Sequence, residues 1–370
     1  MPDWVRLDDD EIWRAGQIGK KILSLLKLSY ARLPSHLRRC LACFNSNYLV
    51  YHWKAHGFLA TSTEKDSQME DVGMQYLEKL FLRCFFQDVE DHVHFFTFKM
   101  HNLIYDFVEE VGQRDCKTVD LRILHTDVNA RHLSFLGVGN SNKKVPSTSN
   151  NFRSIIMRSL QSQSVTESFD NKWISNFKCL RLLSLSGLKF QELPESVGAL
   201  KQLRFLDLSE NSDLEKLCET IYEVQDLKWL EKLVIYSCPK LKLKWELQDK
   251  DPRLNLKVFM IYDLQVVDLP QLILQRSANT LEDIRIEKCP KLTELPTWLA
   301  NLTALQKLEI MSCSGLSSLP AGMEKLTALR ELKIQKSPRL SESCRQKSLN
   351  IPNLEIHLDP EGASSSRDNE

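Results

Sequence analysis

Hydrophobic positions recur with a fixed period in the C-terminal half of this chain. Three stretches, LEDIRIEKCPKL from Leu281, LQKLEIMSCSGL from Leu305 and LRELKIQKSPRL from Leu329, nearly superimpose after a shift of 24 residues. They share the pattern L-x-x-L/I-x-L/I-x-x-C/S-x-x-L. Apolar and polar residues alternate at its centre, as in a β-strand with one buried face. The pattern therefore predicts one short strand per copy.

Weaker copies extend this array in both directions. A period in the twenties, with one strand and one convex segment per unit, is typical of leucine-rich repeats. We therefore predict an α/β fold in which residues 130–357 stack into a solenoid with a curved parallel sheet. The last two apolar positions of each triplet should enter the core. The weaker triplets are Ala130-Leu133-Phe135, Phe152-Ile155-Met157, Leu180-Leu183-Leu185, Leu203-Leu206-Leu208, Leu230-Leu233-Ile235, Leu256-Phe259-Ile261 and Ile351-Leu354-Ile356.

The segments between the strands carry their own pattern. LPESVGAL, LPTWLANL and LPAGMEKL each supply a Leu-Pro corner followed by an apolar convex segment. Cys238, Cys289 and Cys313, with Ser337 in the next unit, occupy a corner at which many such proteins carry Asn. Disulfide or metal chemistry is one interpretation of these thiols. The favoured one is a set of small buried side chains that close the turn.

Strand residues that alternate with the core positions should line the concave face and read a partner. In the last three repeats, two columns alternate in charge: Asp283, Lys307, Glu331 and Arg285, Glu309, Lys333. Neighbouring strands can satisfy these charges by ion pairing, so this segment is expected to be electrostatically self-sufficient. Partner contacts are therefore expected to concentrate on the apolar and aromatic residues of earlier units. The predicted partner-binding residues are Arg181, Arg204, Phe205, Val234, Tyr236, Val258, Met260, Tyr262, Glu287 and Met311.

Length, charge and cysteine usage narrow the function classes. A chain of 370 residues is expected to hold about two domains, and its formal net charge of +0 gives no general reason to expect nucleic acid or anionic lipid as a partner. No apolar run is long enough to span a bilayer, and the acidic N-terminus does not resemble a secretory signal. Ten scattered cysteines fit a reducing compartment. We therefore expect a soluble cytoplasmic protein with a polar segment at 1–20 and a disordered tail at 358–370.

Residues 21–125 follow a different, mainly helical pattern. Apolar spacing predicts helices around 22–29 and 34–44, a third that contains Leu49 and Trp53 and ends near Gly57, and a clearer one over 71–86. Residues 87–99 are expected to form a hairpin, followed by a helix over 100–111. This order predicts a winged-helix-like domain.

The same residues carry a family resemblance. ILSLLKLSYARLPSHLRRCLACF, LVYHWKAHGFL, MEDVGMQYLEKLFLRCFFQD and FKMHNLIYDFVEEVG resemble the winged-helix end of the nucleotide-binding module in plant intracellular disease-resistance proteins. These are immune receptors of the coiled-coil, nucleotide-binding, leucine-rich-repeat type. The resemblance implies that the repeats bind a pathogen effector or a guarded host protein. It also implies that His101, in the stretch Met100-His101-Asn102, lies where the family holds ADP.

Three departures limit that comparison. The phosphate loop G-x-x-x-x-G-K-[ST] is absent, and the stretch from Gly16 to Lys21 has the wrong spacing. We therefore expect no nucleotide cofactor for this chain, with ADP or ATP relevant only in the full-length family context. A segment that usually follows the position of Phe44 is missing. Asn102 replaces the acid of the family's Met-His-Asp motif, which should loosen the inactive state.

Other candidate sites have simpler explanations. Cys40 and Cys43 form a lone C-x-x-C pair, too little for a zinc site. His52 and His56 share a helix face at i, i+4 spacing, but no third ligand is evident, so we expect a solvated face and no metal site.

The leading hypothesis is a non-enzymatic recognition protein of plant defence that lacks its own nucleotide switch. Such a truncated receptor could act as a decoy or regulator that pairs with a full-length receptor, or be the product of a degraded gene. One alternative is the tail of an ADP/ATP-dependent switch ATPase. Another is a ubiquitin-ligase substrate adaptor, since LPSHLRRCLACF resembles the opening of an F-box. No Ser-His-Asp, Cys-His or paired-carboxylate arrangement stands out in the sequence.

Overall fold

The chain divides into two compact units, Met1–Lys117 and Thr118–Glu370. Each unit has its own set of buried apolar residues. In the computed structural model, the residues whose structure is described are 46–59, 67–83, 85–92, 95–100, 116–120, 130–136, 151–158, 172–188, 190–218, 221, 227–243, 254–346 and 354–358.

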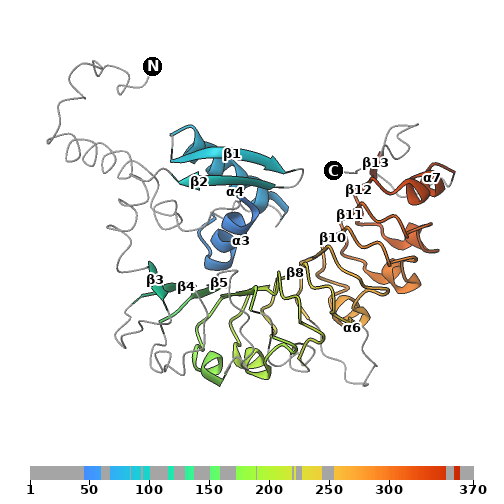
Figure 1. Ribbon diagram of the computed structural model, residues 1–370. Helices are drawn as coiled ribbons and strands as arrows, with labels where there is room; N and C mark the ends of the chain where they lie inside the picture. The colour runs from blue at the N-terminus through green and yellow to red at the C-terminus, as the bar shows by residue number, and fades with distance from the viewer. Residues whose placement is uncertain are drawn as a thin grey trace, which may run out of the picture. The chain divides into compact units, whose positions relative to one another are not determined.

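Two helices and a hairpin form the described part of the first unit (Figure 1). They are α3 (Ser46–His56), α4 (Ser67–Phe81), β1 (Phe86–His92) and β2 (Phe95–Met100). Helix α3 ends as expected at Gly57, whose φ of 69° is a left-handed conformation that glycine adopts at little cost. The antiparallel hairpin also matches the prediction, with Phe86 opposite Met100. The helices expected around 22–29, 34–44 and 100–111 lie outside the described residues.

The prediction for α4 was wrong at both ends. The helix begins at Ser67 and ends at Phe81, not at residue 86, and Phe85 is buried just before β1. The apolar spacing continues past the true end because Phe86 and Phe98 pack against Phe81, with ring centroids 5.2 Å from it in each case. Apolar residues that fill the core after a chain reversal can extend a helical pattern by accident.

The second unit is built on one eleven-stranded sheet whose order follows the sequence from β13 back to β3. Every strand pairing that the structure describes in it is parallel, as expected for stacked repeats. The strands are β3 (Cys116–Asp120), β4 (His132–Leu136), β5 (Ser154–Arg158), β6 (Leu182–Ser186), β7 (Phe205–Asp207), β8 (Lys232–Tyr236), β9 (Val258–Tyr262), β10 (Asp283–Glu287), β11 (Lys307–Met311), β12 (Glu331–Gln335) and β13 (Glu355–Leu358).

Short helices connect these strands and lie on the side of the repeats opposite the sheet (Figure 1). Three of them fall on the predicted Leu-Pro segments: η3 (Glu195–Ala199), η5 (Thr297–Asn301) and η6 (Met323–Lys325). The others are η2 (Lys172–Asn176), α6 (Gln271–Arg276) and α7 (Pro338–Gln346). Buried residues such as Val197 and Leu299 come from these helices and close the core over the strands.

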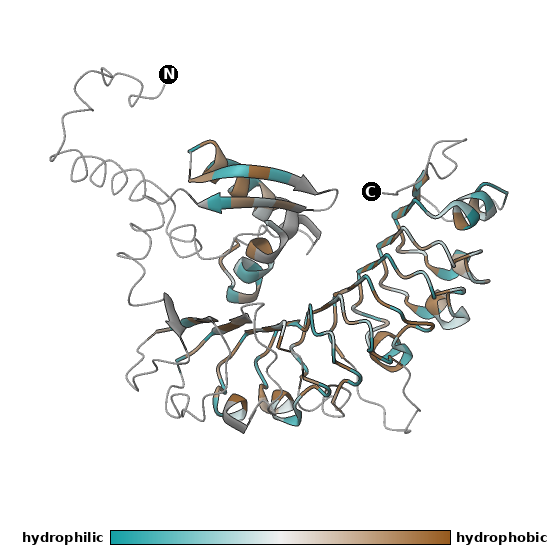
Figure 2. Cartoon of the chain, in the orientation of Figure 1, coloured by the Kyte–Doolittle hydropathy of each residue, from teal (hydrophilic) through white to brown (hydrophobic). Residues whose placement is uncertain are grey.

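The apolar triplets fill the core as predicted in all repeats except the last. Leu233 and Ile235 of β8, for example, lie beside Phe259 and Ile261 of β9, and all four are buried. Figure 2 shows hydrophobic positions recurring from one strand to the next through the array. A buried Leu or Ile contributes about 1.5–3 kcal/mol, so the stacked triplets account for much of the unit's stability.

The predicted register of the last repeat was wrong by two residues. Leu332 and Ile334 of β12 pair with Ile356 and Leu358, so the columns of the core continue through these two residues and not through Leu354 and Ile356. Leu354 and Leu358 are partly buried against the core. Ile356 is 41% exposed, since no described strand covers its outer side. At this end of the described sheet the apolar pattern is weaker, and two registers fit the sequence equally well.

Each strand leaves the sheet through the same corner. The corner residue has a positive φ in seven successive units, and six of the seven are not glycine: Gly187, Glu210, Ser237, Asp263, Lys288, Ser312 and Lys336. The backbone N–H of six of these, from Gly187 to Ser312, donates to the carbonyl just before the corner of the next repeat, as from Ser237 to Tyr262 O at 3.0 Å. This bond continues the sheet ladder into the corner and helps offset the cost of the left-handed conformation.

Where the buried residue that follows the corner is polar, its side chain bonds the backbone there. Asn211, which the sequence analysis did not single out, donates to the carbonyls of Leu185 and Leu208, both at 2.8 Å, and accepts from Leu188 N at 2.8 Å. Cys238 makes a weaker version, with Sγ 3.2 Å from Leu208 O. Ser337 Oγ accepts from Cys313 N at 3.0 Å.

The corner cysteines are small buried side chains, as favoured above. Cys238, Cys289 and Cys313 are free and fully buried. Burial raises the pKa of the Cys238 thiol to about 12, so it stays protonated at neutral pH.

Gly73 is a test of helix packing in the first unit. A Cβ at this position would lie 2.5 Å from Cγ1 of Val50, which is buried on α3. We expect Gly73→Ala to destabilise the unit by about 1–3 kcal/mol through overpacking. Helix propensity alone favours Ala by about 1 kcal/mol. The sign of the change in unfolding free energy therefore distinguishes overpacking from helix propensity. Urea unfolding with hydrogen exchange of the α3 and α4 peptides measures it, and exposed Gln75→Ala is the control. A stabilised Gly73→Ala protein would contradict the close contact.

Asn211 tests the corner. Asn211→Ala leaves buried carbonyls of Leu185 and Leu208 without their amide donor, and we expect a loss of about 1–3 kcal/mol in urea unfolding. Asp213→Ala, in the same turn, removes only an exposed ion pair with Lys240 and should have a much smaller effect. Equal effects of the two substitutions would show that the side-chain bonds of Asn211 do not stabilise the repeat.

Candidate partner-binding face

Parallel pairing places the outward strand residues of successive repeats in three rows across the sheet. The entry row runs through Leu182, Phe205, Lys232, Val258, Asp283, Lys307 and Glu331. The middle row holds Ser184, Asp207, Val234, Met260, Arg285, Glu309 and Lys333. The exit row, at the end of the strands, holds Tyr236, Tyr262, Glu287, Met311 and Gln335. All the predicted partner-binding residues except Arg181 and Arg204 lie in these rows.

Three of those residues are not available at the surface. Phe205, Val258 and Met311 are buried, at 3%, 5% and 5% exposure, although strand alternation points them outward. Side chains of neighbouring strands, only about 4.8 Å away, cover one another, and a medium-sized apolar residue can be enclosed on the outward face too. The expectation that these three residues offer an exposed contact was therefore wrong.

Arg181 and Arg204 lie just before their strands. The backbone N–H of Arg204 donates to the carbonyl of Arg181 at 2.8 Å, and that of Arg181 to the carbonyl of Arg153 at 2.8 Å. The two residues therefore occupy equivalent places in successive repeats. Burial, and then the neighbouring Arg153 and Arg204, lower the pKa of Arg181 from its ordinary value. The guanidinium still keeps its charge at neutral pH.

The most exposed aromatic residue of the face is Tyr236, and it forms a pair with Tyr262. Their ring centroids are 4.8 Å apart in an edge-to-face arrangement. Tyr236 is 36% exposed. Lys288 is the corner residue of the next repeat. Its Nζ donates to the Tyr262 hydroxyl at 2.6 Å and lies 4.9 Å from the centroid of the Tyr262 ring. This hydrogen bond raises the pKa of Lys288. The sequence analysis did not connect Lys288 with Tyr262, because the bond joins residues 26 apart in sequence.

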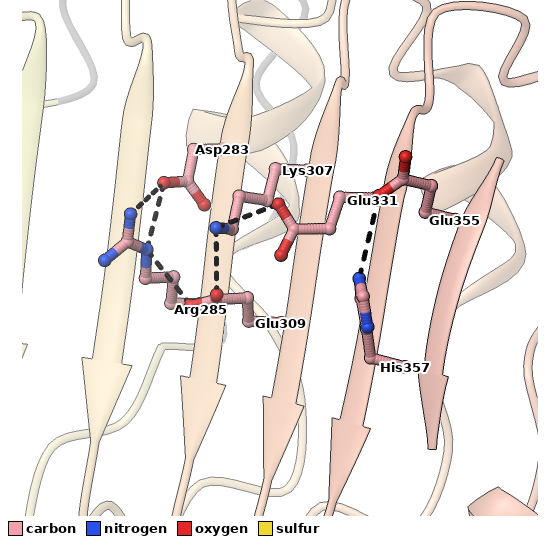
Figure 3. A network of polar contacts seen from close by, with 7 residues as sticks. All are labelled: Asp283, Arg285, Lys307, Glu309, Glu331, Glu355 and His357. Carbon is pink, nitrogen blue, oxygen red and sulfur yellow. Dashed lines mark hydrogen bonds and ion pairs between the residues drawn. The ribbon is translucent and has the colours of Figure 1, made fainter. Parts of the chain in front are cut away.

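Part of the ion pairing predicted for the last repeats is present: Arg285–Glu309 and Lys307–Glu331 join neighbouring strands (Figure 3). Arg285 bonds Asp283 on its own strand at 2.7 Å and Glu309 on the next at 3.3 Å. Lys307 joins Glu309 and Glu331, both at 3.0 Å. The register of β10, β11 and β12 brings the two cross-strand pairs together, as the alternating columns predicted. The contacts Asp283–Arg285 and Lys307–Glu309 lie within one strand, and the columns did not predict them.

The pKa values of two acids in this region are shifted in opposite directions. Burial alone would raise the pKa of Glu309, but Arg285 and Lys307 outweigh it and hold the pKa below its ordinary value. Burial raises the pKa of Glu287, and the cations around it, Lys288, Lys336 and Lys333, only partly offset that. Glu309 therefore stabilises the fold as a carboxylate, whereas charged Glu287 carries a cost.

One polar cluster on this face was missed by sequence reasoning. Asp207 is buried and accepts from Ser184 Oγ at 2.9 Å and from Ser209 N at 3.0 Å. Ser184 and Asp207 are neighbours in the middle row, so the register could have indicated the contact once the strands were aligned.

The predicted sites of the first unit fare differently. His101, expected near a nucleotide, lies outside the described residues, as do Cys40 and Cys43. The solvated face expected for His52 and His56 was wrong, since their side chains are 5% and 8% exposed and their rings lie 4.5 Å apart. Among the helices that the structure describes, none combines the length and apolar character needed to cross a bilayer.

The fold and the outward rows define a leucine-rich-repeat protein with a second, helix-and-hairpin unit. Residues 42–108 match the model of the winged helix domain of disease resistance proteins. The chain is 31% identical to RGA1 of Solanum bulbocastanum over 218 residues, which are 56% of this chain and 20% of RGA1. It is 28% identical to RPP13-like protein 1 of Arabidopsis thaliana, over 62% of this chain and 23% of that protein. The chain is thus similar to plant disease-resistance proteins over these stretches, and it spans about a fifth of the length of these relatives.

Solved structures add little to this assignment. The repeat domain of the type III effector XopL is 18% identical, with a TM-score of 0.32 over 48% of this chain and 75% of that one. The plant peptide hormone receptor RGFR1, solved with RGF2, is 20% identical, with a TM-score of 0.25 over 60% of this chain and 46% of that one. The parallel register described above is the stronger observation for the fold.

Opposite effects of two substitutions test the electrostatics of the face. We expect Glu309→Gln to lower the unfolding free energy at pH 7 by about 1–3 kcal/mol, because Arg285 and Lys307 lose a charged partner. Glu287→Gln should be neutral or stabilising there, since it removes a charge that burial disfavours.

The pH dependence of the unfolding free energy tests the same assignment independently. The pKa of Glu309 is depressed, so its stabilisation is present above the ordinary value of 4.5 and is lost as pH falls further. The pKa of Glu287 is raised, so its cost applies at neutral pH and disappears as pH falls towards 4.5. Urea unfolding at several pH values measures, for each variant, how its difference in unfolding free energy from wild type changes with pH. Slopes of the same sign for the two variants would contradict the assignment.

Proposed function

We propose that the repeats of this chain recognise a protein in plant defence, either a pathogen effector or a host protein that the receptor monitors. In this role the chain acts in the cytoplasm as a binding module and catalyses no reaction. The relatives reported above are disease-resistance proteins, which supports the defence setting. The observation that carries the binding role is the partly exposed Tyr236–Tyr262 pair on the outward face of the repeats.

The chemistry of this pair suits protein recognition. Tyrosines supply large contact areas with little rotamer entropy to lose, and such residues are common at the centres of protein interfaces. Val234 and Met260, both half-buried, lie beside the pair in the middle row and add apolar surface. Glu287 follows Tyr262 in the exit row and offers a polar contact. We propose these five residues as the centre of the interface, with Arg181 and Arg204 contributing from earlier repeats.

A nucleotide does not enter this proposal. The 370 residues lack the phosphate loop described above, so ADP or ATP would be relevant only within a longer family member. The winged-helix match over 42–108 favours a receptor over a ubiquitin-ligase adaptor. Pairing with a full-length receptor is a further contact that this face or the first unit could make.

The test is a comparison of captured proteins. We would immobilise the full chain, expose it to extracts of pathogen-challenged plant tissue, and compare wild type with Tyr236→Ser and Tyr262→Ser by quantitative mass spectrometry. A true partner should be enriched by wild type and reduced roughly tenfold or more by either substitution, since central aromatic residues dominate interface energies. Trp229→Ser, at a residue that is 48% exposed but lies outside the rows, is the matched control.

Two results would count against the proposal. Equal capture by wild type and both tyrosine variants, with unchanged thermal unfolding, would remove the contact patch. No protein enriched over an unrelated leucine-rich-repeat control would remove protein recognition as the function of this chain.

A further inference from the structure

The charges of repeats β10 to β12 do not all cancel. Asp283, Arg285, Lys307, Glu309 and Glu331 bond one another in the network of Figure 3. Three nearby cations stand outside it: Lys288, Lys333 and Lys336. Within the described part of the chain, none of these three forms an ion pair. Counted with Glu287, the strands and corners of these three repeats hold five cations and four acids, a local surplus of one positive charge.

The corner geometry gathers these cations. Lys288, Ser312 and Lys336 occupy the same left-handed corner in three successive repeats. Lys288 N donates to Met311 O and Ser312 N to Gln335 O, each at 2.9 Å, so the corners advance by one strand spacing at a time. Lys288 and Lys336 are therefore about 10 Å apart along the sheet, with the small side chain of Ser312 between them. Lys333 lies three residues before Lys336 on β12, in register with Glu309 of β11, and all three lysines act electrostatically on Glu287.

This positive charge is local. The same corner holds Glu210 and Asp263 in earlier repeats, so the row changes from acidic to basic at Lys288. The change of sign falls beside the Tyr236–Tyr262 pair, because Lys288 bonds the Tyr262 hydroxyl. That bond also holds the ammonium group in place before any partner arrives, which reduces the entropy lost on binding.

We infer that the partner presents a short acidic protein segment to Lys288, Lys333 and Lys336, a group named here the basic corner, while an apolar or aromatic residue of the same segment packs on Tyr236 and Tyr262. This inference rests on the proposed function and specifies the partner's chemistry. Two carboxylates at alternate positions of an extended segment lie roughly 7 Å apart, a separation that flexible lysines about 10 Å apart can bridge.

A long polyanion fits this surface less well than a short acidic segment. The carboxylates of Glu287, Glu309 and Glu331 lie on β10, β11 and β12 and would repel a phosphate backbone that continues across these strands. The balanced charge of the whole chain gives no wider attraction.

The experiment uses the full chain and a defined probe, a fluorescein-labelled decapeptide of alternating Glu and Tyr. Fluorescence anisotropy should show binding that weakens as salt rises. We expect the double substitution Lys288→Glu with Lys336→Glu to weaken it by about tenfold or more, because two attractive contacts become repulsive. Lys288→Gln with Lys336→Gln should give a smaller loss and serves if the reversed pair unfolds. Lys178→Glu with Lys325→Glu makes the same charge change at exposed positions outside the basic corner.

The outcomes separate this inference from the proposed function. Equal loss with the Lys178 and Lys325 control, or equally tight binding of a ten-nucleotide thymidine strand, would show general polyanion attraction and overturn the basic corner. If the tyrosine substitutions abolish capture of a plant protein while the lysine substitutions change neither capture nor probe binding, the basic corner is wrong and the proposed function stands. If no plant protein is captured by wild type but the probe binds and responds as expected, the acidic preference holds and the defence role fails.

Discussion

The structure depends on the fact that one repeat cannot bury its own inward residues. Ile284 shows the constraint, because it is buried with Phe259 on one side and Leu308 on the other. Each strand must therefore pair with its neighbours in one register, and a slip by one residue would turn its apolar side chains to solvent. Stability then arises from the interfaces between repeats more than from any single repeat.

The register that the core imposes also determines the outward face. Once Ile284 lies beside Leu308, Arg285 must lie beside Glu309, and Glu287 beside Met311. The ion pairs, the tyrosine pair and the surplus cations are consequences of that alignment. A row residue is consequently constrained by two neighbouring repeats as well as by its own strand, which is why the same residue type has different properties in different rows.

Glu309 and Glu287 illustrate this dependence. Both are glutamates on adjacent parallel strands, and both are at least half-buried. Glu309 lies between Arg285 and Lys307 at hydrogen-bonding distance, so its charge is favourable. Burial dominates the pKa shift of Glu287, and the cations around it only partly offset that effect. This difference bears on recognition. A charged side chain that is already paired within the sheet, such as Glu309, gains less from a binding partner than a lysine that has no ion pair there.

The sequence by itself determined the period, the strand positions of most repeats, the parallel architecture and the cross-strand ion pairs Arg285–Glu309 and Lys307–Glu331, because apolar spacing and strand pairing are both set by the same repeated backbone. The sequence also indicated that Tyr236 and Tyr262 lie on the outward face of their strands. Only the tertiary structure decided that Phe205, Val258 and Met311 are covered, that His52 and His56 are buried, that β13 is aligned two residues later, and that Lys288 reaches Tyr262. Each of these depends on how much space neighbouring side chains leave, which spacing along one chain does not encode.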